Sequence, residues 1–130
     1  REIENICIRM GVKYVFKFLS DDEMEEYLNE SSIVILPYKK IYQSGIILHA
    51  ISYARPVICS DIPPFKNFIE KYRCGKLFVS EDYINLSEVL INISKAEIKR
   101  FENSIHNQIL KESDWYKIGF LTYEKYLNEC

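Results

Sequence analysis

Short apolar runs alternate with helical segments between residues 12 and 79, and this alternation restricts the fold more than any other feature of the sequence. Residues 33–36 are four consecutive apolar side chains, a pattern typical of a strand that is covered on both faces. Residues 12–18, 56–59 and 76–79 have strand-like patterns as well. Strands that alternate with helices over short connections pair in parallel through right-handed crossovers. We therefore predict an α/β fold with a doubly wound parallel sheet of about four strands, in which residues 33–36 form a central strand.

Serine and proline residues mark where the helices begin. Ser20 precedes Glu23 by three residues, and Ser94 precedes Glu97 by the same spacing, which is the capping-box signature of a helix start. Pro63 favours another helix start, because proline is well tolerated in a first turn. Beyond the last predicted strand the pattern is helical only. The sheet is therefore predicted to be followed by C-terminal helices.

Size, charge and cysteine content exclude several classes of protein. The chain has 130 residues, of which 48% are apolar and 28% are charged, as expected for one soluble globular domain. Its 17 basic and 19 acidic residues give a net charge of -2, which leaves little to attract nucleic acid. The longest uncharged stretch, residues 41–54, is shorter than the roughly 20 residues of a membrane helix. The four cysteines form no C-x-x-C pair, so we expect reduced thiols, no bound metal and a cytoplasmic protein.

The loop after residues 33–36 is the candidate binding site. Ligands of open parallel sheets bind beyond the carboxyl ends of the strands, where loops lead into helices. Ser44 and Gly45 stand at a predicted helix start, where unpaired N–H groups favour anions and a glycine lets a phosphate approach the backbone. A diphosphate fits this arrangement, although serine is also a common N-cap with a purely structural role. Lys39 and Lys40 lie in the same loop, where they either are solvated or help to neutralise the phosphates.

Four motifs, in this order and spacing, resemble the donor-binding half of family 4 glycosyltransferases. They are LPY (36–38), QSGIILHA (43–50), ARPVICSD (54–61) and CGKLF (74–78). Residues 15–24 are similar to that family's strand, turn and capped helix, and residues 113–118 to its closing helix. The resemblance implies a Rossmann-like domain of the GT-B fold. It also implies that residues 1–130 are a single nucleotide-sugar-binding domain and a piece of a longer two-domain enzyme.

The resemblance implies binding roles for individual residues. The positions concerned are Phe18, Leu19, Tyr38, Gln43, Ser44, Gly45, Ile46 and His49. Backbone amides of Ser44, Gly45 and Ile46 would bind the diphosphate of the donor. Tyr38 belongs to the same loop, and Gln43 would contact the transferred sugar.

Two of these roles have a structural alternative. The turn that contains Phe18 and Leu19 would meet the nucleotide base, but Phe18 is explained equally well as the end of a strand in the core. His49 would reach a ribose or phosphate oxygen, but a histidine in an apolar helix is also a common packing residue. Arg55 precedes Pro56 and is predicted to brace the turn from helix to strand.

The chain departs from the family pattern at its glutamates and at its basic pair. The family commonly carries two glutamates separated by seven residues, which meet the transferred sugar and the ribose, and here these positions are Ile41 and His49. The family's basic pair, which offsets the leaving diphosphate, has no match in residues 1–16. Transfer needs charge stabilisation where the nucleotide diphosphate departs. No catalytic residue is therefore assigned, and we predict that the 130 residues alone are inactive.

The function implied for the full-length protein is transfer of a sugar from a nucleotide sugar to a glycan or lipid-linked acceptor, in surface polysaccharide synthesis. By resemblance the reaction needs no metal or other cofactor and retains the anomeric configuration. The alternative is a non-catalytic nucleotide-sugar-binding or assembly domain of the same fold, which the two missing glutamates favour. A receiver-type signalling domain fits less well, because Asp61 is the only acid near the end of a central strand.

The implied partners follow from the same resemblance. The acceptor would be bound by an N-terminal domain outside the 130 residues, nucleic acid is not expected, and peripheral membrane association of the full-length enzyme stays open. A sheet of this type would lack the two strands that separate residues 12–18 from residues 33–36. Open strand edges invite pairing. We therefore predict that residues 12–18 pair directly beside residues 33–36, or that the piece self-associates.

Overall fold

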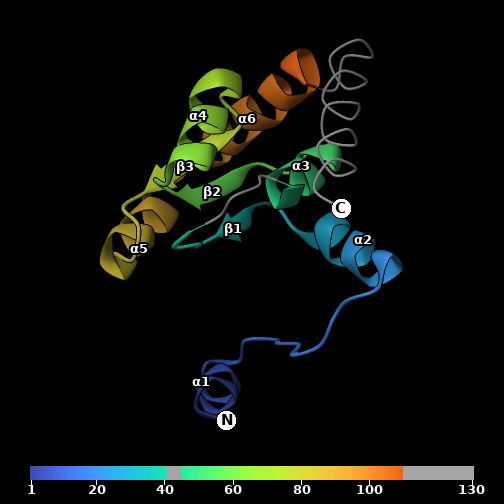
Figure 1. Cartoon of the computed structure of the whole chain (residues 1–130), viewed down its shortest axis with the longest axis vertical. Coiled ribbons are helices and arrows are strands. Elements are labelled where there is room, and N and C mark those ends of the chain that lie inside the picture. The colour runs from blue at the N-terminus through green and yellow to red at the C-terminus, as the bar shows by residue number, and fades with distance from the viewer. Residues whose placement is uncertain (41–44, 110–130) are drawn as a thin grey trace.

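The computed structural model describes residues 1–40 and 45–109, which form one α/β unit (Figure 1). The elements, in chain order, are α1 (Glu2–Met10), α2 (Asp21–Glu30), β1 (Val34–Leu36), α3 (Gly45–Ser52), β2 (Val57–Ser60), α4 (Pro63–Tyr72), β3 (Gly75–Phe78), α5 (Tyr83–Asn92) and α6 (Lys95–Gln108). The helix expected after residue 113 lies outside the described residues.

The sheet is parallel, and its three strands run in the order β1-β2-β3. Val57 on β2 is opposite Val34 on one side and Gly75 on the other. This confirms the α/β class, the parallel pairing and three of the expected strands. β2 is the central strand, and all four of its residues are buried.

The prediction that residues 33–36 form a central, doubly covered strand is wrong for the part of the chain that the structure describes. β1 is an edge strand, and Ile35 is 40% exposed. An apolar run indicates that the side chains are shielded from water, but it does not determine which elements cover them or whether the strand lies at the centre or the edge of the sheet. One face of β1 contributes Leu36 to the core while the other keeps Ile35 at the surface.

The strand predicted at residues 12–18 is also wrong. Residues 12–19 form an irregular connection between α1 and α2, away from the sheet (Figure 1). Val12, Phe16 and Phe18 are exposed. β-branched and aromatic residues favour strands only where a neighbouring strand completes the hydrogen bonds and packing, and β1 pairs only with β2 among the described strands. Direct pairing of this segment with β1 is therefore excluded, and self-association stays a prediction.

The core lies where α3, α4 and α6 meet the sheet. Its buried side chains come from helices and strands that are far apart in sequence, and the fully buried ones include Ile47, Ile51, Val57, Phe65, Cys74 and Ile105. On α6, Phe101 and Ile105 are buried, and Ile109, which follows the helix, is buried in the core as well. Helix α1, in contrast, contributes no buried residue.

The predicted helix starts are confirmed. The Ser20 hydroxyl accepts a hydrogen bond from the Glu23 N–H at 3.2 Å, and the Glu23 carboxylate accepts one from the Ser20 N–H at 2.8 Å. Ser94 and Glu97 form the same reciprocal pair at the start of α6. Pro63 is the first residue of α4. Each box satisfies backbone N–H groups that would otherwise lack a partner.

Arg55 braces the turn between α3 and β2, as predicted. Its Nε donates to the Leu28 carbonyl oxygen at 2.8 Å, and its Nη2 donates to the Asn29 carbonyl oxygen at 3.1 Å. Both acceptors lie in the last turn of α2, where helix carbonyl groups lack internal partners and carry partial negative charge. Arg55 therefore fixes α2 against the turn that leads into the central strand.

Cys59 and Cys74 are free thiols buried in the sheet region. Burial raises the pKa of Cys74 to about 12 and raises the pKa of Cys59 well above its usual range. Cys7 is half-buried on α1 and also forms no disulfide, whereas Cys130 lies outside the described residues. The two buried thiols are thus packing groups, because the thiolate is the reactive form.

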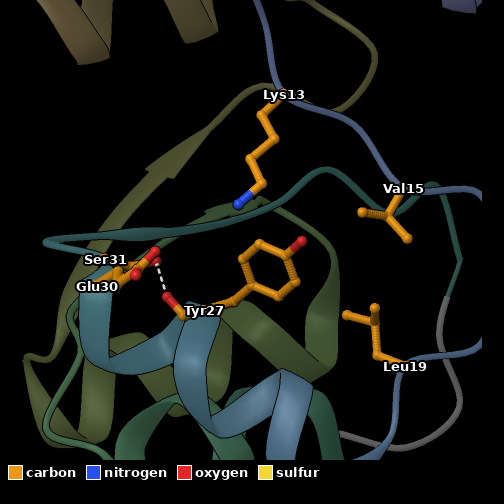
Figure 2. A pocket seen from close by; sticks show the side chains of 6 residues that line it. All are labelled: Lys13, Val15, Leu19, Tyr27, Glu30 and Ser31. Atoms are coloured by element: carbon orange, nitrogen blue, oxygen red, sulfur yellow. Dashed lines mark hydrogen bonds between the residues drawn. The ribbon is translucent and has the colours of Figure 1, made fainter.

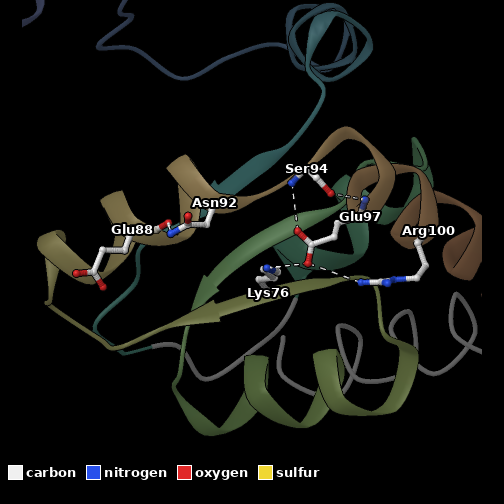
Figure 3. A network of polar contacts seen from close by, with 6 residues as sticks. All are labelled: Lys76, Glu88, Asn92, Ser94, Glu97 and Arg100. Carbon is white, nitrogen blue, oxygen red and sulfur yellow. Dashed lines mark hydrogen bonds and ion pairs between the residues drawn. The ribbon is translucent and has the colours of Figure 1, made fainter.

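The start of α6 carries a charge network that makes stability depend on pH (Figure 3). The Glu97 carboxylate lies 2.9 Å from the Lys76 ammonium and 3.6 Å from the Arg100 guanidinium, and it accepts the Ser94 N–H at 3.1 Å. The hydrogen bond from Lys76 first, and that from Ser94 second, hold the pKa of Glu97 below its usual range. A depressed carboxyl pKa stabilises the fold above the pKa of the unfolded state and loses that effect as the pH falls through the folded-state value.

The substitution Glu97→Gln is therefore expected to lower the urea midpoint modestly at pH 7, and the difference from wild type should shrink as the pH falls toward 3. Urea unfolding followed by circular dichroism at several pH values measures this. Glu88→Gln, which removes the same charge from the exposed side of α5, is the control and should show no such convergence. A difference that stays constant with pH would contradict the assignment of the effect to the Glu97 charge.

Candidate functional site

Three loops meet at the carboxyl edge of the sheet. Because the strands are parallel, the ends of β1 at Leu36, β2 at Ser60 and β3 at Phe78 lie at the same edge. The segments that follow are residues 37–40, residues 61–62 and residues 79–82. This is the edge where open α/β sheets bind ligands.

Ser60 anchors the first of these loops. It is the one polar side chain that is buried among the residues described, and its hydroxyl donates to the Tyr38 carbonyl oxygen and lies 3.4 Å from that of Leu36. The Tyr38 ring packs edge-on against Phe65 of α4, with 6.0 Å between ring centroids. The backbone just after β1 is therefore held by both β2 and α4.

The loop after β3 is held by side chains from three positions. The Asp61 carboxylate accepts the Ser80 N–H at 2.8 Å, and the Asn85 side-chain oxygen accepts the Val79 N–H at 2.7 Å. Asp82 caps α5 by accepting the Asn85 N–H at 2.9 Å. These hydrogen bonds fix a short loop whose third residue, Glu81, adopts a left-handed backbone with φ 65°.

An ion pair joins the first loop to the third. The Lys39 ammonium lies 3.0 Å from Glu81 Oε1, and this hydrogen bond is the main reason that the pKa of Lys39 is raised. Lys39 is therefore paired with a carboxylate rather than simply solvated. Sequence reasoning missed Glu81, since an acidic side chain gives no signal for an anion site. A comparison of the residues that follow each strand would have indicated that Lys39 and Glu81 lie at the same edge of the sheet.

Helix α3 is the next element after β1 and begins at Gly45. Gly45 is the first helical residue and is exposed, and a Cβ placed on it would meet no atom within 4 Å. Ile46 is half-buried and packs against the core. The first N–H groups of a helix have no partner within the helix and carry partial positive charge. A methyl-sized group therefore fits at the Cβ position of Gly45.

The other predicted binding residues are distributed as follows. Tyr38 belongs to the anchored loop, and Gln43 and Ser44 lie outside the described residues. His49 is half-buried one turn into α3, with its ring centroid 5.9 Å from that of Tyr53. Tyr38 therefore lies in the loop after β1, whereas Gly45, Ile46 and His49 lie on α3.

Phe18 and Leu19 lie before α2, on the irregular connection. The Phe18 side chain is fully exposed, so the alternative that it ends a strand in the core is wrong.

Leu19 lines a hollow of about 450 Å³ together with Lys13, Val15, Tyr27, Glu30 and Ser31. Figure 2 shows Lys13 and Tyr27 facing each other across it, with the ammonium 5.1 Å from the ring centroid. The nearby Lys17 forms an ion pair of 2.7 Å with Glu23.

A comparison with protein families gives a match over most of the chain. The family described as "Glycosyl transferases group 1" matches residues 2–95. The chain belongs to this family. Two curated proteins from Xanthomonas campestris pv. campestris, each named "GDP-mannose:glycolipid 4-beta-D-mannosyltransferase", are 26% identical to it over 129 residues. The match covers 96% of this chain and 35% of each relative, so the chain spans about a third of the length of these relatives.

Membership confirms the resemblance noted from the motifs and agrees with the observed fold. The chain is a member of the group 1 glycosyltransferase family, and its parallel sheet flanked by helices is consistent with a Rossmann-like, partial GT-B domain. No helix among the described residues is long and apolar enough to cross a membrane. Those residues also contain no group of three or more metal-ligating side chains.

Proposed function

We propose that this glycosyltransferase chain binds the nucleotide-sugar donor of the full-length enzyme through the start of α3. The observation that supports the proposal is Gly45, the first residue of the helix that follows β1, where an added Cβ would meet no atom within 4 Å. A diphosphate matches a helix start in charge, and its oxygens accept hydrogen bonds from the unpaired N–H groups.

The proposed reaction is transfer of a hexose from a nucleoside diphosphate to a glycan or lipid-linked acceptor during surface polysaccharide synthesis. The names of the two relatives specify GDP-mannose and a glycolipid, so GDP-mannose is the first donor to test. We propose that the reaction needs no metal or other cofactor, that it takes place in the cytoplasm, and that the acceptor is held by another part of the full-length protein. On this proposal the 130 residues alone bind donor without transferring sugar.

A second candidate function is a nucleotide-sugar-binding or assembly domain without activity. It is favoured by Ile41 and His49, which occupy the positions where the family resemblance leads us to expect glutamates. Titration of the full-length protein with GDP-mannose, followed by an assay for donor hydrolysis and for transfer to a glycolipid, separates the two. Binding with turnover supports the enzyme, and binding without turnover supports the alternative.

The substitution Gly45→Ala is expected to weaken GDP binding about tenfold, because the added methyl group occupies the space in which a phosphate would approach the backbone. The fold should be unaffected, since nothing lies within 4 Å of the new Cβ. Isothermal titration with GDP measures the affinity, and titration with guanosine, which has no phosphate, is the control. Equal weakening for both ligands, or no change for GDP, would contradict the proposed diphosphate site.

A further inference from the structure

A cavity of about 650 Å³ is lined by the end of α4, the start of β3 and α6. Its volume is within the range of about 300–1,000 Å³ that is typical of small-molecule sites. Three of its lining residues, Ile69, Gly75 and Phe101, are buried. Because Gly75 starts β3 opposite Val57, the first residue of β2, the cavity lies at the amino edge of the sheet. It is therefore separate from the loops at the carboxyl edge.

The other lining side chains are cationic or are neutral hydrogen-bonding groups. They are Arg73, Arg100, Asn103, Ser104, Asn107 and Gln108. None of the described residues that line the cavity is acidic, whereas the whole chain has a net charge of -2. A guanidinium group binds a phosphate through two parallel hydrogen bonds, and an amide side chain both donates and accepts, as a sugar hydroxyl requires. This set of side chains fits an anion that also carries hydroxyl groups.

The Arg100 guanidinium is exposed and keeps its hydrogen-bond donors for a ligand. Its side chain is 71% exposed, and its Nη2 lies 3.6 Å from Glu97 Oε1, which is too far for a hydrogen bond. That carboxylate oxygen instead lies 2.9 Å from the Lys76 ammonium (Figure 3). The Arg100 guanidinium also lies over the Phe101 ring, 5.8 Å from its centroid. Arg100 is thus placed at the cavity without being used up by the neighbouring carboxylate.

Hydrogen bonds hold the opposite sides of the cavity together. Arg73 is the C-cap of α4, and its N–H donates to the Ile69 carbonyl oxygen at 2.8 Å. The Ser104 hydroxyl of α6 donates to the Tyr72 carbonyl oxygen at 2.9 Å, and Gln108 Nε2 donates to Ser104 Oγ at 2.9 Å. The end of α4 is therefore fixed against α6, and the cavity is formed before any ligand binds.

We propose that this cavity binds a phosphorylated sugar, with Arg73 and Arg100 on the phosphate and the Asn103 and Asn107 amides on the sugar hydroxyl groups. A phosphate monoester carries a charge of about -1.5 to -2 at pH 7, which two guanidinium groups balance, whereas a carboxylate carries a single charge. The inference goes beyond the proposed function and does not depend on it, because the two sites lie at opposite edges of the sheet.

The ligand test is isothermal titration of the full-length protein with glucose 6-phosphate, glucuronate and glucose, which share one type of ring and differ in charge. Glucose 6-phosphate is expected to bind with a Kd of about 1 mM or below. Glucuronate should bind about 3–10-fold more weakly, since it has fewer charge-assisted hydrogen bonds, and glucose more weakly still. Inorganic phosphate alone should bind about tenfold more weakly than glucose 6-phosphate, because it lacks the hydroxyl groups that the amides would contact.

Three outcomes of these titrations overturn the inference. They are no binding of glucose 6-phosphate at about 10 mM, equal binding of glucose 6-phosphate and glucose, and equal binding of glucose 6-phosphate and inorganic phosphate. Saturating GDP should leave the affinity for glucose 6-phosphate unchanged. Competition between the two ligands would mean that they share one site, and it would overturn the inference as well. Failure of GDP to bind would count against the proposed function alone.

The substitution Arg73→Gly tests the site without loss of the fold. The backbone of Arg73 is left-handed, with φ 49°, a conformation that glycine adopts more easily than arginine. The variant is expected to have an equal or higher urea midpoint and to bind glucose 6-phosphate about 3–10-fold more weakly, because one charge-assisted pair is lost. Arg100→Gln should weaken binding by a similar factor. Arg73→Lys, which keeps the charge but loses the planar group, should weaken it less.

The matched control is Lys66→Gln, which removes one positive charge from an exposed position on α4 that does not line the cavity. It should leave the affinity for glucose 6-phosphate unchanged. An equal loss of affinity in Lys66→Gln and Arg73→Gly would mean that only the overall charge matters, and it would overturn the inference. Unchanged binding in both Arg73→Gly and Arg100→Gln would overturn it too.

Discussion

The substitution Gly75→Ala is expected to unfold the sheet or to lower the free energy of unfolding by about 3 kcal/mol or more. Gly75 starts β3 directly opposite Val57 of the central strand. A Cβ at Gly75 would lie 1.8 Å from the Val57 carbonyl oxygen and 2.8 Å from its carbonyl carbon. Inserting one methyl group into a close-packed interior typically costs about 1–3 kcal/mol, and here the obstacle is paired backbone, which cannot turn aside as a side chain does.

Urea unfolding followed by circular dichroism measures this loss. Gly45→Ala is the matched control, because it makes the same chemical change where the new Cβ meets no atom within 4 Å. Its free energy of unfolding should stay within about 0.5 kcal/mol of wild type or rise slightly, since alanine favours helix over glycine. Similar unfolding midpoints for the two alanine variants would show that β3 does not pair with β2 in this register.

The substitution Phe65→Ala is expected to lower the free energy of unfolding by about 3–5 kcal/mol, the usual cost of deleting a fully buried aromatic ring. Phe65 is 0% exposed and belongs to the core cluster between α4 and the sheet. Phe18→Ala is the control, because the Phe18 side chain is fully exposed and its removal should change stability by less than about 0.5 kcal/mol. Both values come from the same urea titrations.

Phe65→Ala should also weaken GDP binding, because the Phe65 ring supports Tyr38 in the loop after β1. Titration at a temperature and urea concentration where the variant is folded separates this effect from unfolding. A stability loss for Phe65→Ala no larger than that for Phe18→Ala would mean that α4 does not pack on the sheet as described.

The features that could be predicted from the sequence are those with local causes. Ser20 and Ser94 each cap a helix through a glutamate three residues later, so the whole signal lies within one turn. The apolar runs at β2 and β3 predicted strands for a similar reason. Their parallel pairing followed from the helices between them, because a crossover of that length leaves few alternatives.

The features that could not be predicted depend on neighbours. Residues 12–18 have the composition of a strand, yet the sequence of the segment does not determine whether a partner strand is available. Ile35 is apolar and exposed for the same reason, since edge or centre is a property of the sheet. The Lys39–Glu81 pair joins residues 42 positions apart. Ser44 and Gly45 could be proposed as a phosphate site from their position in the sequence. The pairing of Glu81 with Lys39, in contrast, can be inferred only once the order of the strands in the sheet is known.

The burial of Cys59 and Cys74 has a consequence for chemical labelling. Both thiols are shielded by the sheet and by the helices packed on it, and burial keeps them protonated. Alkylating reagents attack thiolates, so they reach this pair only in molecules whose strands have separated. Alkylation of Cys59 and Cys74 therefore reports opening of the sheet. A change that loosens β2 or β3 should increase the alkylation of these two residues.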